Sequence, residues 1–272
     1  MFVSVSGQEI AYRRSPGQGR PVVLVHGNSS SSRTWRSLLE GPFGQRHQCL
    51  ALDLPGHGAS PPPAAGSGVY SLPGYAAVLA GFVKELDSRD AVIVGWSLGG
   101  HIALEAVSAL PDAAGFVIYG APPVSSLADM PEAFLPAPTM QTSFTADVDP
   151  DAALAYATAF LAPDSPLSTA DLVADILATD GAARSELAAS LATGPYADEV
   201  EVVATLDRPL AILHGEHEQF VNLDYLTKLH APTLWRGAVQ VIAPAGHAPH
   251  EETPEELAAL LDQFIDDLPT RN

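Results

Sequence analysis

Six short apolar runs, separated by longer helical patterns, constrain the fold of this chain more than any other feature. The runs are Pro21–Val25, Cys49–Leu52, Ala91–Val94, Gly115–Tyr119, Pro209–Leu213 and Val239–Ile242. Continuous apolar runs of this length are typical of strands that are buried on both faces. Because helices alternate with them, the sequence predicts an α/β fold with a mostly parallel, doubly wound sheet. A hairpin of 2–6 and 9–13 around Gly7 brings the expected number of strands to about eight.

Residues 121–200 differ from the rest of the chain in composition and pattern. They are rich in Ala, Pro, Ser and Asp and contain no good strand pattern, whereas 151–161 and 169–179 have helical patterns. A helical insertion between two strands is most simply a cap over the end of the sheet. We therefore expect a core made of 1–120 and 201–272, with 121–200 as a helical cap.

The final helix has the clearest start signal in the chain. Thr253 is a suitable N-cap, Pro254 stands at the first helical position, and Glu256 at the third completes a capping box. Apolar residues then recur at helical spacing up to Leu268. The sequence predicts an amphipathic helix whose first turn is capped by the Thr253 side chain.

The composition excludes several classes of function. The chain has 272 residues, 47% hydrophobic and 17% charged, so it can bury a large core. Lys+Arg is 13 and Asp+Glu is 32, and a net charge of 13 − 32 = −19 disfavours binding to nucleic acid or to anionic lipid. Cys49 is the single cysteine, which excludes an internal disulfide and a cysteine metal cluster. No signal-peptide pattern and no run of 18 apolar residues is present, so we expect a cytoplasmic protein.

A G-x-S-x-G motif follows the third apolar run directly. It reads Gly95-Trp-Ser-Leu-Gly99, and a helical pattern begins at Leu98. A sharp turn between strand and helix would lift the Ser97 hydroxyl above the carboxyl edge of the sheet, and the small residues leave room for the helix to cross. The alternative is a glycine-rich helix start with an idle serine. Since both the strand and the helix are in place, Ser97 is the predicted nucleophile.

Among nine histidines, His247 is the predicted general base for Ser97. It lies in the loop between the last apolar run and the final helix, at the carboxyl edge of the sheet. The alternative is a solvated loop histidine.

An acid is needed to orient His247, and the order serine, acid, histidine points to the loop after 209–213. Glu216 and Glu218 both qualify in that loop. Glu218 is favoured because it lies three residues after Gly215. Asp224 is a third choice, but it is more simply interpreted as part of the following helix.

Two N–H donors are needed to stabilise an oxyanion beside Ser97. One is the backbone of Leu98, which follows the nucleophile. The other should be the main chain of Asn28, in the polar loop His26–Ser32 that follows the first buried strand. We expect His26 itself to have a structural role.

Two histidine pairs have a spacing that could suit a metal. These are His214 with His217 and His247 with His250. Neither pair includes the glutamate of an H-E-x-x-H motif, and no nucleotide-binding glycine motif is present. The prediction is therefore no metal and no cofactor, with His250 at the surface.

These landmarks together resemble the α/β-hydrolase superfamily over nearly the whole chain. The matching stretches are His26–Asn28, Asp53–Gly58, Gly95–Gly99, Gly215–Glu218 and Gly246–His247. The resemblance implies the α/β-hydrolase fold with a helical cap.

A narrower resemblance is to the metal-independent, quorum-quenching N-acyl-homoserine lactonases. It rests on the stretches 26–31, 95–102, 120–124, 215–221 and 245–249. It implies that Glu218 is the triad acid, that Asn28 belongs to the oxyanion loop and that Tyr156 contacts the substrate. The chain departs from that family over 130–144 and 187–199 and at Gln219, which stands where the family often has proline.

The implied reaction is opening of an N-acyl-homoserine lactone ring through an acyl-enzyme on Ser97. Apolar cap residues are candidates for holding the acyl chain: Phe134, Leu135, Phe144, Leu154 and Phe160. Trp96, beside the nucleophile, is a candidate for lining the substrate pocket, and the alternative is that it packs against the cap. The alternatives are a general carboxylesterase, a cofactor-free perhydrolase and a non-catalytic ligand receptor. The expected partner is a small acyl lactone or ester, with no nucleic acid and no membrane, and the expected assembly is a monomer or weak homodimer.

Overall fold

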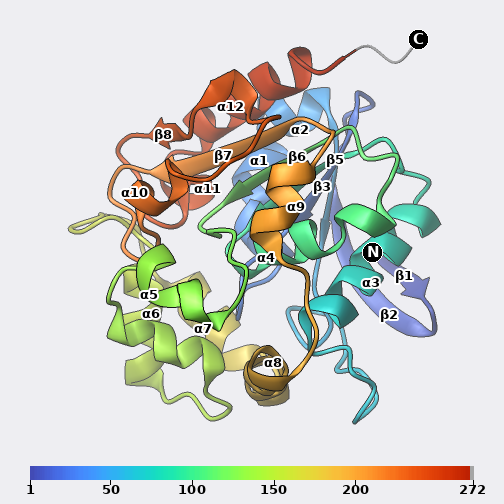
Figure 1. The fold of residues 1–272 in the computed structure, drawn as a ribbon. Coiled ribbons are helices and arrows are strands. Elements are labelled where there is room, and N and C mark those ends of the chain that lie inside the picture. The colour runs from blue at the N-terminus through green and yellow to red at the C-terminus, as the bar shows by residue number, and fades with distance from the viewer. Residues whose placement is uncertain (270–272) are drawn as a thin grey trace.

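A single eight-stranded sheet runs through the computed structural model, which describes residues 1–269 (Figure 1). The strands are β1 (Phe2–Val5), β2 (Gln8–Arg14), β3 (Pro21–Val25), β4 (Gln48–Leu52), β5 (Val92–Trp96), β6 (Gly115–Tyr119), β7 (Leu210–Gly215) and β8 (Gln240–Ile242). Their order across the sheet is β1-β2-β4-β3-β5-β6-β7-β8. β1 and β2 pair antiparallel, β2 also joins β4 antiparallel, and the other neighbours are parallel. The predicted α/β class and strand number are confirmed.

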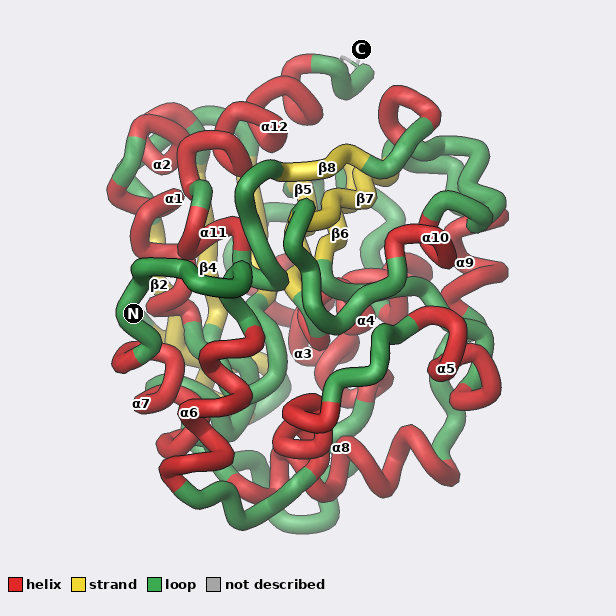
Figure 2. Tube along the Cα trace, turned by 90° about the vertical axis from the view of Figure 1, so that its left-hand side faces the viewer, coloured by secondary structure: helices red, strands yellow, loops and turns green. Residues whose placement is uncertain are grey.

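Helices cover both faces of the sheet, which explains why the central strands are mostly apolar. Every residue of β5, β6 and β7 is buried. One face carries α3 (Leu72–Glu85), α4 (Leu98–Glu105) and α9 (Glu199–Thr205), and the other carries α1 (Arg36–Glu40), α2 (Pro42–Arg46), α11 (Pro249–Glu252) and α12 (Pro254–Asp266) (Figures 1 and 2). The short helix α10 (Leu223–Leu226) follows β7. Short 3₁₀ turns are η1 (Ser32–Trp35), η2 (Val107–Ala109) and η5 (Trp235–Gly237). None of the helices within 1–269 combines the length and apolar character needed to cross a membrane.

Residues 121–200, called the cap segment below, lie mainly at one end of the sheet (Figure 1). Their elements are η3 (Leu127–Asp129), α5 (Met130–Ala133), η4 (Pro138–Phe144), α6 (Pro150–Ala159), α7 (Ala170–Ala178) and α8 (Gly181–Thr193), together with the start of α9. The segment has no strand, and α6 and α7 match the two predicted helical stretches. The division of the chain into a core and a cap stays a prediction.

The start of α12 differs from the predicted capping box. Thr253 occupies the N-cap position, but its side chain makes no capping hydrogen bond. Its hydroxyl instead donates to the carbonyl of Pro249, 3.3 Å away. The physical reason is that helix α11 ends at Glu252, directly before Thr253. The Thr253 hydroxyl therefore binds a carbonyl of α11 and is not available to cap α12.

The strand order reverses direction at β3, and this determines where a site can form. The chain moves from β3 to β4 on one side and then returns to β5 on the other side of β3. The loops after β3 and β5 therefore diverge, and ligands of open α/β sheets bind in such a crevice at the carboxyl ends of the strands. Asn28 and Ser97 lie in these two loops.

Candidate active site

Ser97 stands on a strained turn between β5 and α4. Its φ of 53° and ψ of −124° lie outside the regions that residues other than glycine normally adopt. A Cβ at Gly95 would lie 2.3 Å from the carbonyl oxygen of Gly99, and one at Gly99 would lie 2.2 Å from that of Val25. The two glycines let the helix cross close to the strands, as the motif predicts, and the turn exposes the Ser97 hydroxyl to the cavity described below.

His247 and Glu218 form a buried pair in the loops after β8 and β7. Nδ1 of His247 lies 3.0 and 2.8 Å from the two carboxylate oxygens of Glu218. Glu218 also accepts a 2.8 Å hydrogen bond from the backbone N–H of Phe220. Burial opposes ionisation of Glu218, but the charge and hydrogen bond of His247, together with the Phe220 N–H, lower the pKa of the carboxyl overall. The carboxylate is therefore suited to hold the imidazole in one orientation.

The other two acids considered from the sequence lie elsewhere. Glu216 is half exposed and faces His217 at 3.5 Å. Asp224 is exposed in the first turn of α10. The structure thus brings Glu218, rather than Glu216 or Asp224, to His247.

Gly120 and Trp96 support the His247 ring. Gly120 has a φ of +63°, and a Cβ there would lie 2.5 Å from Cε1 of His247. The indole Nε1 of Trp96 donates a 2.8 Å hydrogen bond to the carbonyl of His247. Trp96 is fully buried and is absent from the cavity lining, so it packs behind the site and does not face a substrate. Gly120 is in the matched stretch 120–124 but is not among the predicted site residues, although a glycine directly after a parallel strand is a usable signal.

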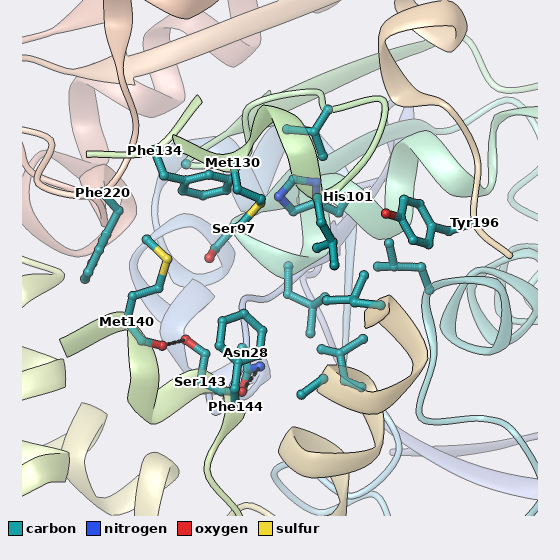
Figure 3. Close-up of a pocket in the computed structure, with 18 of the residues that line it drawn as sticks. Asn28, Ser97, His101, Met130, Phe134, Met140, Ser143, Phe144, Tyr196 and Phe220 are labelled. Carbon is teal, nitrogen blue, oxygen red and sulfur yellow. Dashed lines mark hydrogen bonds between the residues drawn. The ribbon is translucent and has the colours of Figure 1, made fainter. Parts of the chain in front are cut away.

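Ser97 and His247 both face a cavity of about 300 Å³ that opens between the sheet and the cap segment. Figure 3 shows Ser97 pointing into it, with Phe220, Met130, Asn28 and Phe144 around it. The lining is mostly apolar and includes Leu72, Val124, Leu127, Phe134, Met140, Leu187 and Leu191. A cavity with this lining and a few polar groups is suited to a small molecule with an apolar part.

The cap residues proposed to hold an acyl chain have different positions. Phe134 and Phe144 line the cavity. Phe160 is buried behind it, with its ring 5.3 Å from that of Trp96. Leu135 and Leu154 are 36% and 49% exposed and point away from the core.

Leu98 and Asn28 both line the cavity beside Ser97. Leu98 is the first residue of α4, where a backbone N–H has no partner within the helix. The Asn28 side chain donates to the carbonyl of Ser143 at 3.0 Å and accepts from the hydroxyl of Ser29 at 2.7 Å. These bonds hold the Asn28 side chain in place in the loop after β3. The oxyanion role of the Asn28 and Leu98 backbones stays a prediction.

Arg184 of α8 ties the cap segment to the same loop. It is 3% exposed, and its Nη1 donates to the Ser29 hydroxyl at 3.1 Å. The guanidinium also donates to the carbonyls of Thr145, Ala146 and Ile176 at 2.7 to 3.1 Å. A guanidinium with five donors is well suited to connect several carbonyls in this way.

Tyr156 lines the cavity from α6, and its contact with a substrate stays a prediction. Its hydroxyl lies 2.7 Å from that of Ser143. Burial raises the pKa of Tyr156 to about 12, although the Ser143 hydrogen bond and Arg184 oppose this. The phenol is therefore neutral. Because the Ser143 hydroxyl donates its proton to the carbonyl of Met140 at 2.8 Å, Tyr156 is the donor to Ser143, and its oxygen can accept a further hydrogen bond.

A second histidine–glutamate pair lines the cavity, and sequence reasoning missed it. Nδ1 of His101 lies 2.9 Å from both carboxylate oxygens of Glu199, which is 1% exposed. His101 follows Ser97 by four residues, so one helical turn after a nucleophile is a signal that could have found it. Glu199 comes from α9, and nothing local in the sequence pairs it with His101.

His250 differs from its predicted surface position. It is fully buried, with Nε2 2.7 Å from the Thr34 hydroxyl and Nδ1 3.0 Å from that of Tyr119. The reason is the short helix α11, which turns this side chain inward under Trp96. Within residues 1–269 no group of three or more His, Cys, Asp or Glu side chains is arranged to hold a metal ion.

Comparisons with solved structures give close matches over the whole chain. N-acyl homoserine lactonase AidH complexed with N-butanoyl homoserine is 34% identical, with a TM-score of 0.94 over 100% of this chain and 99% of that one. A variant of AidH complexed with N-hexanoyl homoserine lactone is 35% identical, with a TM-score of 0.93 over 98% and 97%. An aryl esterase from Burkholderia cenocepacia, described there as putative, is 23% identical with a TM-score of 0.82 over 98% and 97%, a likeness of fold alone.

Curated relatives are more distant. The bifunctional biotin biosynthesis protein BioHC of Cellvibrio japonicus is 31% identical over 92% of this chain and 49% of its own length. The 2-(acetamidomethylene)succinate hydrolase of Mesorhizobium japonicum is 28% identical over 93% and 90%. This chain thus spans about half the length of the first of these relatives.

The family model described as "Alpha/beta hydrolase family" matches residues 22–260. This range contains the turn at Ser97, the Glu218–His247 pair and the cap segment. The chain therefore belongs to the alpha/beta hydrolase family.

Proposed function

We propose that this protein is a serine hydrolase that opens the ring of N-acyl-homoserine lactones. The observation that carries the proposal is the Glu218–His247 pair, in which His247 lines the same mostly apolar cavity as Ser97. The matches to AidH bound to N-hexanoyl homoserine lactone and to N-butanoyl homoserine support the choice of substrate.

In the first half of the reaction, Ser97 Oγ attacks the lactone carbonyl carbon while Nε2 of His247 takes its proton. The carboxylate of Glu218 stabilises the imidazolium that forms. Collapse of the tetrahedral intermediate breaks the bond to the ring oxygen, which takes the proton from His247. The product of this half is an acyl-enzyme in which the former ring oxygen is a free hydroxyl.

In the second half, His247 removes a proton from a water molecule as the water attacks the ester of Ser97. The bond to Ser97 then breaks, Oγ recovers its proton from His247, and N-acyl-homoserine leaves. The sum is one water added and the amide bond intact.

The negative oxygen of each tetrahedral intermediate is assigned to the backbone N–H groups of Leu98 and Asn28. The N-terminus of α4 adds a positive potential at this point. Each donor of this kind contributes about 3 kcal/mol to lowering the barrier. Tyr156, with a neutral hydroxyl in the cavity, is assigned to contact the substrate.

The apolar wall formed by Phe134, Phe144 and Leu187 is assigned to the acyl chain. Since lactones of this type are signalling molecules, the proposed activity is quorum quenching. We expect it in the cytoplasm, with no cofactor, from a monomer or weak homodimer.

Mass spectrometry of products from a panel of N-acyl-homoserine lactones tests the proposal, with Ser97→Ala as the control. We expect a gain of one water with the amide intact, absent in the control. Free fatty acid plus homoserine lactone would make the protein an acylase. An unchanged panel with Ser97-dependent cleavage of simple esters would make it a general carboxylesterase, and tight binding without turnover would make it a receptor.

A further inference from the structure

Four residues of the cap segment contact both loops that carry the Glu218–His247 pair. They are residues 159–162, called the exit segment below, where the chain leaves α6. A Cβ at Gly246 would lie 2.5 Å from the backbone nitrogen of Ala162 and 2.6 Å from the carbonyl carbon of Leu161. The exit segment and the loop of His247 therefore pack backbone against backbone, directly before the histidine.

Glu252, at the end of α11, holds these two backbones together. One carboxylate oxygen accepts from the N–H of Gly246 at 2.6 Å, and the other accepts from the N–H of Ala162 at 2.9 Å. Hydrogen bonds from N–H groups to a carboxylate are charge-assisted and stronger than those between neutral groups. Glu252 thus ties the residue before His247 to the exit segment.

The residue after His247 is bound to the same segment. The N–H of Ala248 donates to the carbonyl of Phe160 at 2.9 Å. Phe160 is buried, and its ring lies 5.7 Å from that of His247. Since Gly246 and Ala248 are both held, the backbone on each side of His247 is fixed relative to the exit segment.

Gln219 makes the corresponding connection on the side of the acid. It follows Glu218 directly, and its Nε2 donates to the carbonyl of Leu161 at 2.7 Å and to that of Ala159 at 3.3 Å. This is a position at which the chain departs from the lactonases that it resembles, and a proline there could make neither bond. The exit segment is therefore bonded to the loop of the acid as well as to the loop of the histidine.

We propose that Glu252 and Gln219 are positioning residues for the hydrolysis and that they act through the exit segment. Neither side chain lines the cavity, so neither is expected to contact the substrate. Their bonds fix the backbone of His247 relative to that of Glu218, so that the imidazole stays oriented while it exchanges protons with Ser97. A small displacement of a reacting group lowers the rate strongly even when binding is kept. This inference rests on the proposed triad and adds part of the cap segment to its scaffold.

The test removes each connection and measures the rate in two ways. Glu252→Gln keeps one acceptor oxygen but turns an amide NH₂ toward the second N–H, and Gln219→Met removes the donor at nearly the same length. The first measurement is kcat and KM with N-hexanoyl-homoserine lactone. The second is the rate of inactivation by diisopropyl fluorophosphate, in which Ser97 Oγ displaces fluoride from phosphorus while His247 takes the proton.

Each variant has a matched control. Glu251→Gln changes the neighbouring glutamate of α11, whose carboxylate accepts from the Thr34 hydroxyl at 2.7 Å. Gln240→Met changes a half-buried glutamine of β8 that donates to the carbonyl of Ala238 at 2.7 Å. Both partners lie outside the exit segment, so both controls should stay within about twofold of the wild type in either rate.

We expect kcat and the inactivation rate to fall about 10- to 100-fold in Glu252→Gln and about 10-fold in Gln219→Met, with KM within about threefold of the wild type. A purely structural role would lower the urea midpoint and leave both rates of the folded protein unchanged. That result in both variants would overturn the inference.

The reagent separates this inference from the choice of substrate, because it reports on Ser97 and His247 without a lactone. A wild type that is inactivated but opens no lactone would overturn the proposed substrate alone, and the inactivation rates of the variants would then decide the inference. A wild type that the reagent does not inactivate would overturn the triad and this inference with it.

Discussion

Arg184 in the cap segment donates a 3.1 Å hydrogen bond to Ser29 in the loop after β3, and Ser29 in turn donates to the side chain of Asn28. Two hydrogen bonds in series thereby connect α8 to the side chain of Asn28, in the loop that is assigned to the oxyanion. The connection suggests that Arg184 positions Asn28 as well as stabilising the cap segment.

Replacing Arg184 by Met should therefore reduce both stability and rate. The carbonyls of Thr145 and Ala146 would lose a buried donor, and we expect the free energy of unfolding to fall by about 3 kcal/mol. Displacement of the loop at Asn28 should lower kcat at least about 10-fold. Urea unfolding and steady-state kinetics measure the two effects, with the exposed Arg14→Met as control. A lower stability with an unchanged kcat in the folded variant would restrict Arg184 to a structural role.

Gly120→Ala should lower the rate by moving the His247 ring. The new Cβ would lie 2.5 Å from Cε1 of His247, so the imidazole must leave its present position. Gly66→Ala is a matched control, because Gly66 has a similar φ of +72° but nothing within 4 Å of its Cβ position. Both variants should lose about 1 kcal/mol of stability from the backbone conformation. In a kinetic assay kcat should fall about 100-fold in Gly120→Ala only, and equal effects in both variants would contradict this account.

Glu218→Gln and Glu216→Gln should show which of the two carboxylates in the loop after β7 is the acid that assists His247. Glu218 is buried against His247, whereas Glu216 is half exposed. An amide in place of Glu218 no longer stabilises the imidazolium and allows the wrong tautomer, so kcat should fall about 10⁴-fold. Glu216→Gln should stay within about twofold of the wild type. The reverse order of rates would transfer the role to Glu216.

The stability of the protein should decrease below pH 6.5 because of buried histidines that stay neutral in the folded chain, His26 and His57 among them. Burial lowers the pKa of His26 to about 4, and burial together with His26 lowers that of His57 to about 3. Below the ordinary value of about 6.5 the unfolded chain takes up protons that the folded chain does not. The free energy of unfolding should therefore fall with pH, by about 1.4 kcal/mol per pH unit for each of them, from about pH 6 to about pH 4.

Urea unfolding at pH 7, 6 and 5 measures this slope. His57→Asn keeps a donor for the carbonyl of Pro55, which accepts from Nδ1 of His57, and it should reduce the slope by the contribution of one histidine. His230→Asn, at an exposed site, should leave the slope unchanged. An equal slope in the wild type and His57→Asn would show that His57 is not protonated on unfolding.

The sequence alone predicts most of the fold, because the patterns that mark strands, helices and the turn at Ser97 each lie within a few neighbouring residues. The apolar runs of β3 to β7 are visible without tertiary information, and Ser97 is marked by the strand before it and the helix after it. The position of His247 at the sheet edge follows from the strand that precedes it.

Other contacts depend on tertiary structure that no local pattern contains. His101 and Glu199 are 98 positions apart, and Arg184 and Ser29 are 155 apart. These pairs meet only when the cap segment folds back on the sheet. The sequence predicts His250 at the surface, yet α11 turns it inward to Thr34 and Tyr119.

The bonds from Asn28 to Ser143 and from Ser29 to Arg184 have a consequence for engineering. A chimera that grafts a foreign acyl pocket onto this sheet would remove both partners of the loop after β3. The cap segment is therefore not an interchangeable module. A working graft must import an equivalent of Arg184 and of the Ser143 carbonyl, or carry its own version of the loop from His26 to Ser32.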